Sequence, residues 1–171
     1  VDVKDLVTDA DSVTFCLSKG LSAPVGSVIC GIEEFIYRAR RIRKALGGGM
    51  RQAGIIAAAG IVSLDKIIAQ IQEDHQNARI LAEGISNIDG LSVDKKNIKS
   101  NIIYFDIDER KSRSKKLNQQ TSNINIYPFE IIIDNIHFFE SRPNCFRLVT
   151  HYGITRKDVE KILVVLGDMV K

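Results

Sequence analysis

Hydrophobic residues alternate with smaller or more polar ones along residues 11–20. This period of two predicts a half-buried strand that runs into a lysine flanked by serine and glycine. A second short apolar stretch, residues 24–31, begins at a proline and ends at a glycine, and predicts another strand. Because a loop of small residues joins the two, we expect an antiparallel pair with Lys19 on the connecting loop.

A period of 3.6 follows between residues 32 and 46 and predicts an amphipathic helix. Two glutamates open this helix and four basic residues close it, which complements the helix dipole. The triplet Gly47-Gly48-Gly49 is typical of a helix end, and residues 50–52 are expected to open the next helix. The apolar face of the predicted helix consists of Ile32, Phe35, Ile36, Ala39, Ile42 and Leu46.

From residue 65 onward the sequence predicts a longer helix and then a small α/β portion. The helix spans residues 65–85 and follows an alanine- and glycine-rich stretch that permits close helix packing. A closing helix over residues 154–170 has Thr155 as a plausible N-cap, with Asp158 three residues on. Between the two helices we expect strands at 101–107, within 124–139 and at 145–151, and a polar loop or exposed helix at 108–122.

Composition narrows the class of protein. The chain has 171 residues, of which 44% are hydrophobic and 26% charged, as in a globular domain. A net charge of +3 makes no strong case for a nucleic-acid or membrane partner. Three cysteines predict reduced thiols and a cytoplasmic location, with Cys16 and Cys30 as small core residues and no metal site. We find no apolar run long enough to span a bilayer and expect none.

Three basic residues are candidates for chemistry. Lys19 would place an amine at the mouth of a sheet, where burial lowers a lysine pKa and allows attack on a carbonyl. Arg51 follows the glycine triplet, where backbone and helix N-terminus could approach a phosphate. Arg147 on a predicted strand could grip a carboxylate with its guanidinium fork. For Lys19 the alternative is a side chain that points to solvent, and for Arg51 it is a plain helix–turn–helix link with an exposed arginine. For Arg147 the alternative is an ion pair with a protein acid at the edge of a strand.

Two further groups have simpler interpretations. The basic end of the 32–46 helix could bind nucleic acid, but it is short and lacks aromatic residues, so a solvated helix end is favoured. Basic residues there could also face an anionic cofactor. His75 lies on the polar side of the 65–85 helix and is expected to be a surface or interdomain residue rather than a base.

Several short motifs occur in one order at one spacing: Ser18-Lys19-Gly20-Leu21, Ala23-Pro24-Val25-Gly26-Ser27 and Leu46-Gly47-Gly48-Gly49-Met50-Arg51-Gln52-Ala53-Gly54. Together they closely resemble the low-specificity L-threonine aldolases, pyridoxal-phosphate enzymes of the aspartate-aminotransferase-like fold. The resemblance runs from residue 11 to 59 and resumes at 74–79, 101–106 and 147–151. The stretch after residue 107 departs from the family pattern.

The resemblance implies an α/β fold, the C-terminal part of a fold type I pyridoxal-phosphate enzyme. Residues 1–64 would end the large cofactor-binding domain, 65–87 would form a linking helix, and 88–171 a small α/β domain. Family members carry a long segment before the lysine, with the aspartate that pairs with the pyridine nitrogen and the histidine that stacks on the ring. We therefore expect this chain to be the C-terminal half of an enzyme, completed by a missing half or a partner chain.

The resemblance also implies roles for single residues. Lys19 carries pyridoxal 5'-phosphate as an internal aldimine, and Ser18 beside it belongs to the cofactor site. Arg51 and Lys44 lie near the cofactor phosphate and are contributed across a subunit interface, which implies a homotetramer built as a dimer of dimers. Arg147 binds the substrate α-carboxylate.

The implied reaction is retro-aldol cleavage of L-threonine or L-allo-threonine to glycine and acetaldehyde, a step of amino-acid metabolism. Two alternatives stay open. A β-eliminating lyase would keep the fold and break a different bond, and the chain by itself could be a catalytically inert fragment or assembly module. We expect the isolated chain to be inactive, because the implied pocket is incomplete.

Overall fold

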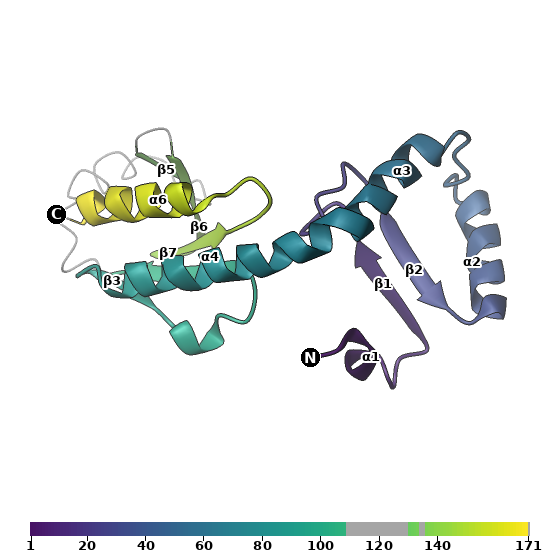
Figure 1. The fold of residues 1–171 in the computed structure, drawn as a ribbon, viewed down its shortest axis with the longest axis horizontal. Helices are drawn as coiled ribbons and strands as arrows, with labels where there is room; N and C mark the ends of the chain where they lie inside the picture. Colours follow the sequence, from purple (N-terminus) through teal and green to yellow (C-terminus); the bar gives the residue numbers. More distant parts are fainter. Residues whose placement is uncertain (109–129, 134–135, 171) are drawn as a thin grey trace. The chain divides into compact units, whose positions relative to one another are not determined.

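The computed structural model describes residues 1–108, 130–133 and 136–170 of the chain (Figure 1). It divides into two compact units, Val1–Ala69 and Gln70–Lys171, and each is described by itself.

The first unit contains a two-stranded antiparallel sheet and three helices. The strands pair from Ser12 opposite Gly31 to Cys16 opposite Ser27, and Lys19 lies on the loop that joins them. This confirms the predicted strand pair and the place of the lysine. The elements are α1 (Val3–Leu6), β1 (Ser12–Cys16), β2 (Ser27–Gly31), α2 (Glu33–Ala45), α3 (Gly54–Val62) and the π-helical turn η1 (Ser63–Ile67).

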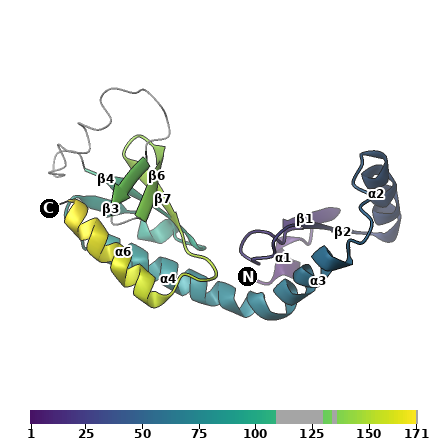
Figure 2. The same ribbon diagram turned by 90° about the horizontal axis from the view of Figure 1, so that it is seen from above.

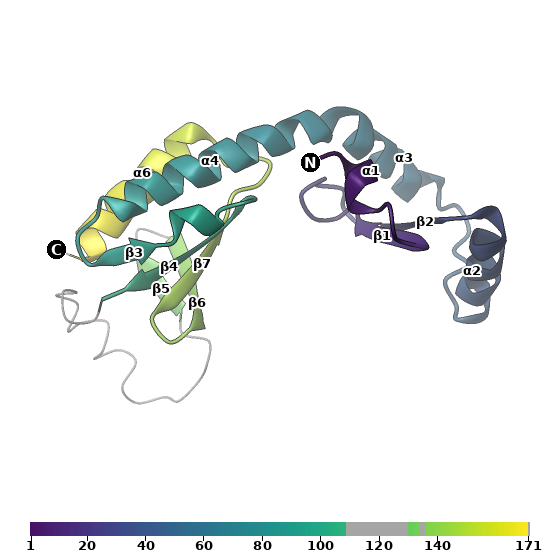
Figure 3. The same ribbon diagram turned by 90° about the horizontal axis from the view of Figure 1, so that it is seen from below.

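In the described part of the second unit, five strands form an antiparallel sheet in the order β3-β4-β7-β6-β5. Helices α4 and α6 lie side by side on one face of this sheet, as Figures 2 and 3 show from opposite sides. Its elements are α4 (Ile68–Ser86), β3 (Leu91–Val93), η2 (Lys95–Asn97), β4 (Ile102–Ile107), β5 (Glu130–Ile133), β6 (Ile136–Arg142), β7 (Cys145–Val149) and α6 (Arg156–Met169).

The hydrophobic core lies between this sheet and its two helices. Phe105 of β4 and Phe146 of β7 stack with ring centroids 5.5 Å apart. Paired residues of antiparallel strands share a face, so the register places these rings on the helix side. The buried cluster comprises Ala78, Leu81, Ala82, Ile85, Leu91, Ile103, Phe105, Phe138, Phe146, Val159, Val165 and Leu166.

Both predicted helices of the second unit are present. In α6 the Thr155 side chain accepts a hydrogen bond from the Asp158 amide and the Asp158 carboxylate accepts from the Thr155 amide. This reciprocal capping box confirms the N-terminus expected from the sequence. Hydrogen bonds from Thr155 lower the pKa of the Asp158 carboxyl below its ordinary value.

Two expectations for the first unit are wrong. The helix predicted to open at residues 50–52 begins at Gly54, because Gln52 adopts a left-handed φ of 52° that a continuing helix excludes. Cys16 and Cys30 are exposed instead of buried. Within residues 1–69 the sheet has two strands, and four of the five residues in each strand are exposed, so no packed layer covers the two thiols.

The expected absence of a long apolar segment is also corrected. The helical segment Gly54–Ser86 contains an 18-residue window of mean hydropathy 1.6, of which 11% is buried, so its length and composition would suit a membrane span. Asp65 and Lys66 interrupt its apolar part. Length and composition alone do not distinguish a span from a helix that packs against protein, and one such helix is weak evidence.

Most of the polar stretch predicted at 108–122 and the turn at Pro128 lie outside the described residues, as does the turn at Asp134-Asn135. Strands β5 and β6 confirm that the 124–139 region contains strands. The short strand β3 had no counterpart among the expected elements, because three residues are too few to display a period.

Candidate active site

The loop after β1 presents Lys19 to solvent. The Lys19 carbonyl accepts a hydrogen bond from the Ser22 amide at 2.8 Å, which closes a tight turn. Ser22 completes the turn with a left-handed φ of 56°, a conformation that serine rarely adopts. The Lys19 side chain and its neighbour Ser18 are exposed. The desolvation that the sequence suggested for the amine is therefore not provided by the described residues.

Leu17, two residues before the lysine, anchors this loop. Its side chain is buried, its amide donates to the Gly26 carbonyl at 2.9 Å, and its carbonyl accepts from the Ala23 amide at 3.0 Å. A Cβ built on Gly60 of α3 would lie 3.0 Å from the Leu17 methyl, so the glycine allows the close approach. Sequence reasoning missed this anchor, although a leucine at the end of an alternating strand beside a glycine-rich helix was its signal.

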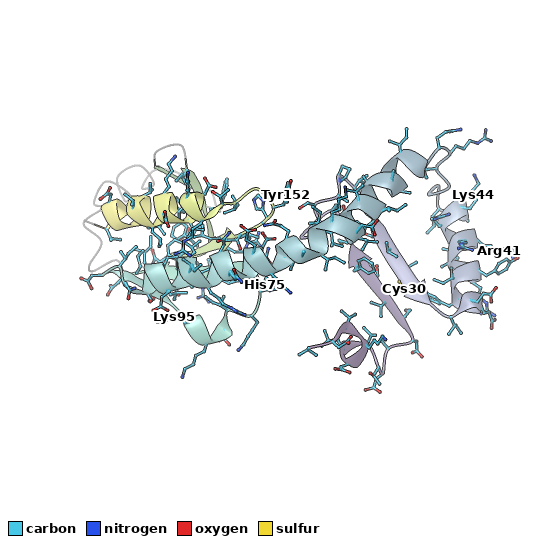
Figure 4. All side chains as sticks on the ribbon, in the orientation of Figure 1. Cys30, Arg41, Lys44, His75, Lys95 and Tyr152 are labelled. Atoms are coloured by element: carbon cyan, nitrogen blue, oxygen red, sulfur yellow. The ribbon has the colours of Figure 1, made fainter. Side chains whose placement is uncertain are left out.

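The glycine triplet ends α2 in a Schellman motif. Gly48 donates to the Arg43 carbonyl at 2.8 Å and Gly47, with φ of 88°, donates to the Lys44 carbonyl at 3.2 Å. The Lys44 side chain lies over Gly49, as a Cβ built on this glycine would be 2.9 Å from the Lys44 amine. Figure 4 labels Lys44 and Arg41 at this basic end of the helix. Gly47 is thus favoured by its φ and Gly48 by its close approach to Arg43, whereas the atoms near Gly49 belong to the Lys44 side chain.

Arg51 follows the triplet and is exposed. Three residues later α3 begins, and no side chain caps its N-terminus. Uncapped amides and the positive end of a helix dipole attract an anion. The amine of Lys44, the guanidinium of Arg51 and these amides are each groups of a kind that binds phosphate. All three belong to the first unit.

Arg147 lies in the centre of β7, opposite Tyr104 of β4. Both side chains are on the outer face of the sheet, away from the helices, since the neighbouring pair Phe105 and Phe146 faces the core. Arg147 is exposed and forms no ion pair within the described part of the chain. The guanidinium is therefore available to a carboxylate ligand.

The predicted residues thus fall into two groups. Lys19, Ser18, Lys44 and Arg51 belong to the first unit, and Arg147 belongs to the second. A hollow of about 330 Å³ on the outer face of the second unit is lined by Ile102 and Tyr104, by Asp94, Asn97 and Ile98, and by Ser141 and Arg142. It includes none of the predicted residues, and the Arg142–Asp106 ion pair of 3.2 Å lies at its edge.

Comparison with known proteins decides the family. The family profile described as beta-eliminating lyase matches residues 1–108, which include the lysine loop, the glycine triplet and β4. This chain belongs to the beta-eliminating lyase family. The family is pyridoxal-phosphate-dependent, in agreement with the resemblance noted in the motifs.

Two curated proteins of known sequence are similar to this chain over most of its length. A low-specificity L-threonine aldolase 1 from Arabidopsis thaliana is 39% identical over 163 residues, which are 95% of this chain and 43% of the relative. A low specificity L-threonine aldolase from Escherichia coli K12 is 35% identical over 161 residues, 94% of this chain and 43% of the relative. The chain therefore spans less than half the length of the curated relatives that it matches.

Solved structures confirm the fold type. A protein from Listeria monocytogenes assigned as an L-allo-threonine aldolase has a TM-score of 0.64 at 17% identity and covers 93% of this chain and 44% of its own. The Sphingomonas wittichii serine palmitoyltransferase has a TM-score of 0.59 at 16% identity, over 96% of this chain and 41% of its own. The chain has the α/β architecture of the corresponding part of fold type I pyridoxal-phosphate enzymes.

The first unit contains residues that fit this cofactor. At the glycine turn, a Cβ on Gly48 would lie 3.2 Å from the Arg43 carbonyl oxygen, and the Lys44 side chain lies over Gly49. Cationic side chains and uncapped helix amides suit a phosphate dianion, and the exposed Lys19 amine suits an aldehyde. Which lysine holds the cofactor stays a prediction.

Proposed function

We propose that this chain is the C-terminal part of a pyridoxal-phosphate-dependent aldolase that cleaves L-threonine or L-allo-threonine to glycine and acetaldehyde. The similarity of about 95% of the chain to low-specificity L-threonine aldolases carries this proposal, since it includes the Lys19 loop, the glycine turn and β7. When bound, the cofactor supplies the electron sink for cleavage of the Cα–Cβ bond.

Each predicted residue has one task in this proposal. The Lys19 amine holds the cofactor aldehyde, with Ser18 beside it, and Lys44 and Arg51 neutralise the phosphate. The Arg147 guanidinium binds the substrate α-carboxylate through two parallel hydrogen bonds, which a planar fork can form and an amine cannot. Its exposed place on the outer face of the sheet supports this task.

The proposal requires more protein than this chain. In the first unit, large apolar side chains are exposed, among them Leu46 and Ile55, each 82% accessible. Apolar surface of this extent is typical of an interface. We infer that the polypeptide supplying the remaining length of the relatives covers it, and that the complete enzyme is a cytoplasmic homotetramer. The chain alone is then inactive.

The decisive experiment uses the complete enzyme, in which this chain is combined with that polypeptide and pyridoxal phosphate. Borohydride reduction followed by peptide mass analysis is expected to find the phosphopyridoxyl group on Lys19. Lys19→Ala is expected to abolish the label and to lower threonine cleavage at least about 100-fold. Lys4→Ala, an exposed lysine of α1, serves as the control and is expected to keep both.

A label on another lysine would contradict the role of Lys19. Product analysis separates the alternative, because the family name also describes β-elimination. Glycine and acetaldehyde from threonine support the aldolase, whereas a keto acid and ammonia would support the eliminating lyase. Cleavage by the isolated chain would show that no second polypeptide is needed.

A further inference from the structure

Three polar side chains are buried where β7 ends and turns toward α6. Asp74 and Asn77 of α4 are 1% and 3% accessible, and Thr150, directly after β7, is 2% accessible. A buried polar group costs free energy unless it is hydrogen-bonded, so its partners reveal what it holds. All the groups concerned belong to the second unit.

Thr150 joins three segments of the chain. Its hydroxyl donates to the main-chain carbonyl of Asp74 at 2.6 Å, across 76 positions of sequence. Its amide donates to the Asn101 carbonyl at 3.0 Å, and its carbonyl accepts from the Asn101 side-chain amide at 2.6 Å. The threonine thus extends the β4–β7 pairing by one residue and fastens the strand end to α4.

Asn77 holds the other end of the same connection. Its side-chain amide donates to the Ile154 carbonyl at 3.0 Å, and the Ile154 amide donates to the His151 carbonyl at 2.9 Å. Helix α4 therefore bonds to the Thr150 hydroxyl on one side of the turn between β7 and α6 and to the Ile154 main-chain carbonyl on the other. The carboxylate of Asp74 takes no part in these bonds, because the Thr150 hydroxyl donates to the main-chain carbonyl of Asp74.

These bonds act on the strand that carries Arg147. Successive side chains of a strand point to opposite faces, so Arg147 and Thr150, three residues apart, face opposite sides of the sheet. Phe146 and Thr150 fasten β7 from the helix side, by ring stacking and by hydrogen bonds. The outer face, with Arg147, is left open. The main-chain position from which the Arg147 side chain extends is therefore fixed from the helix side of the sheet.

We propose that Thr150 is a positioning residue for Arg147, which it holds in the direction required for the substrate carboxylate through its bonds to Asp74 and Asn101. This inference rests on the proposed function for the identity of the carboxylate. Bidentate hydrogen bonds depend on the direction of both partners, so a guanidinium displaced with its strand binds the carboxylate less tightly. A strand end freed from α4 would lower the affinity for the carboxylate while the reacting groups stay intact.

The test compares variants of the complete enzyme. Thr150→Val keeps the shape and loses the hydroxyl, and we expect KM for L-threonine to rise about 3- to 10-fold, the factor that one buried hydrogen bond represents. We expect kcat to stay within about twofold, because the weakened contact between Arg147 and the carboxylate is made alike in the ground state and the transition state. Thr150→Ser keeps the hydroxyl and is expected to restore KM.

Two further variants give reference values of KM for comparison with Thr150→Val. Arg147→Lys removes the fork itself and is expected to raise KM more than Thr150→Val does. Ser86→Ala removes another hydroxyl of the same unit and is expected to keep KM. This hydroxyl donates to the Glu83 carbonyl at 2.7 Å, so its bond lies within α4 and does not involve β7. Amide exchange of the β7 residues in the chain itself is expected to quicken in Thr150→Val and to return to normal in Thr150→Ser.

The outcomes separate this inference from the proposed function. An active enzyme whose KM is unaltered by Thr150→Val overturns the positioning role, as does a loss in kcat and melting temperature without a change in KM. An inactive wild-type enzyme contradicts the proposed function instead. Amide exchange then decides whether Thr150 fastens β7, and unaltered exchange in Thr150→Val overturns the inference in that case too.

Discussion

Lys19 and Asp74 show how far the solvation of a single charged residue can depart from its sequence pattern. Lys19 ends an apolar strand and is exposed, whereas Asp74 belongs to a helix with many polar residues and is 1% accessible. A signal for Asp74 was present, because it lies three residues after Ile71 and four before Ala78, on the apolar face of α4. A lone acid on such a face indicates a buried carboxylate.

The buried carboxyl of Asp74 is expected to make the stability of the fold depend on pH. Burial raises the pKa of its carboxyl above the ordinary value of 3.8, against the opposing effect of nearby His151, a Gln70 hydrogen bond and His75. Its Oδ1 atom has no hydrogen-bond partner among the described residues. The folded state therefore holds this proton more tightly than the unfolded chain, so stability falls as the pH rises from 3.8 through the raised pKa.

Asp74→Asn removes the buried charge and keeps the main-chain carbonyl that Thr150 uses. We expect its melting temperature to exceed that of the wild type by about 4–8 °C at pH 7, the shift that about 1 kcal/mol represents in a unit of this size. The difference should shrink as the pH approaches 3.8. Glu160→Gln, which removes an exposed carboxylate of α6, is the calorimetric control. A lower melting temperature for Asp74→Asn at pH 7 would refute the expected cost of burial.

Helices α4 and α6 show what local patterns predict about an element and where they stop. Their periods and the capping box at Thr155 predicted both helices within a few residues. The distance between the helices depends instead on a glycine of α4. A Cβ built on Gly84 would lie 2.3 Å from one Leu163 methyl carbon and 2.5 Å from the other, so the helices meet backbone against side chain there.

Gly84→Ala is therefore expected to destabilise the second unit by about 1–3 kcal/mol, because the added methyl forces the helices apart. Gly167→Ala in α6 is the matched control, since its Cβ would meet no atom within 4 Å. It is expected to be neutral or stabilising by up to about 1 kcal/mol, as alanine is the better helix former. Denaturant unfolding measures both. Equal effects of the two substitutions would show that the packing at Gly84 is not tight.

In the molecule as a whole, the two units differ in how much core they contain. Every residue of the buried hydrophobic cluster belongs to the second unit. Among residues 1–69 the buried hydrophobic side chains are Leu17 and Ala23. A segment with so few buried apolar contacts opens easily, whereas a packed sheet with two helices opens only in global unfolding.

Amide exchange of the isolated chain is expected to reflect this difference. The amides of α4, β4 and β7 should be protected most strongly, while those of β1 and β2 exchange orders of magnitude faster. Protection of β1 and β2 should rise when the polypeptide that completes the enzyme is added. Equal protection of both units in the isolated chain would mean that the first unit is stable without further protein.

The sequence by itself determined the elements, the fold class and the family of this protein. Helical periods, the Thr155 cap and the strand alternation around Lys19 depend on neighbouring residues, and the ordered motifs identify the family through residue types alone. Only the tertiary structure decided which of these residues are buried or joined. The Thr150–Asp74 bond, the Leu17–Gly60 contact and the Gly84–Leu163 contact connect residues far apart in the chain. No local period records such contacts, because they exist only once the chain has folded.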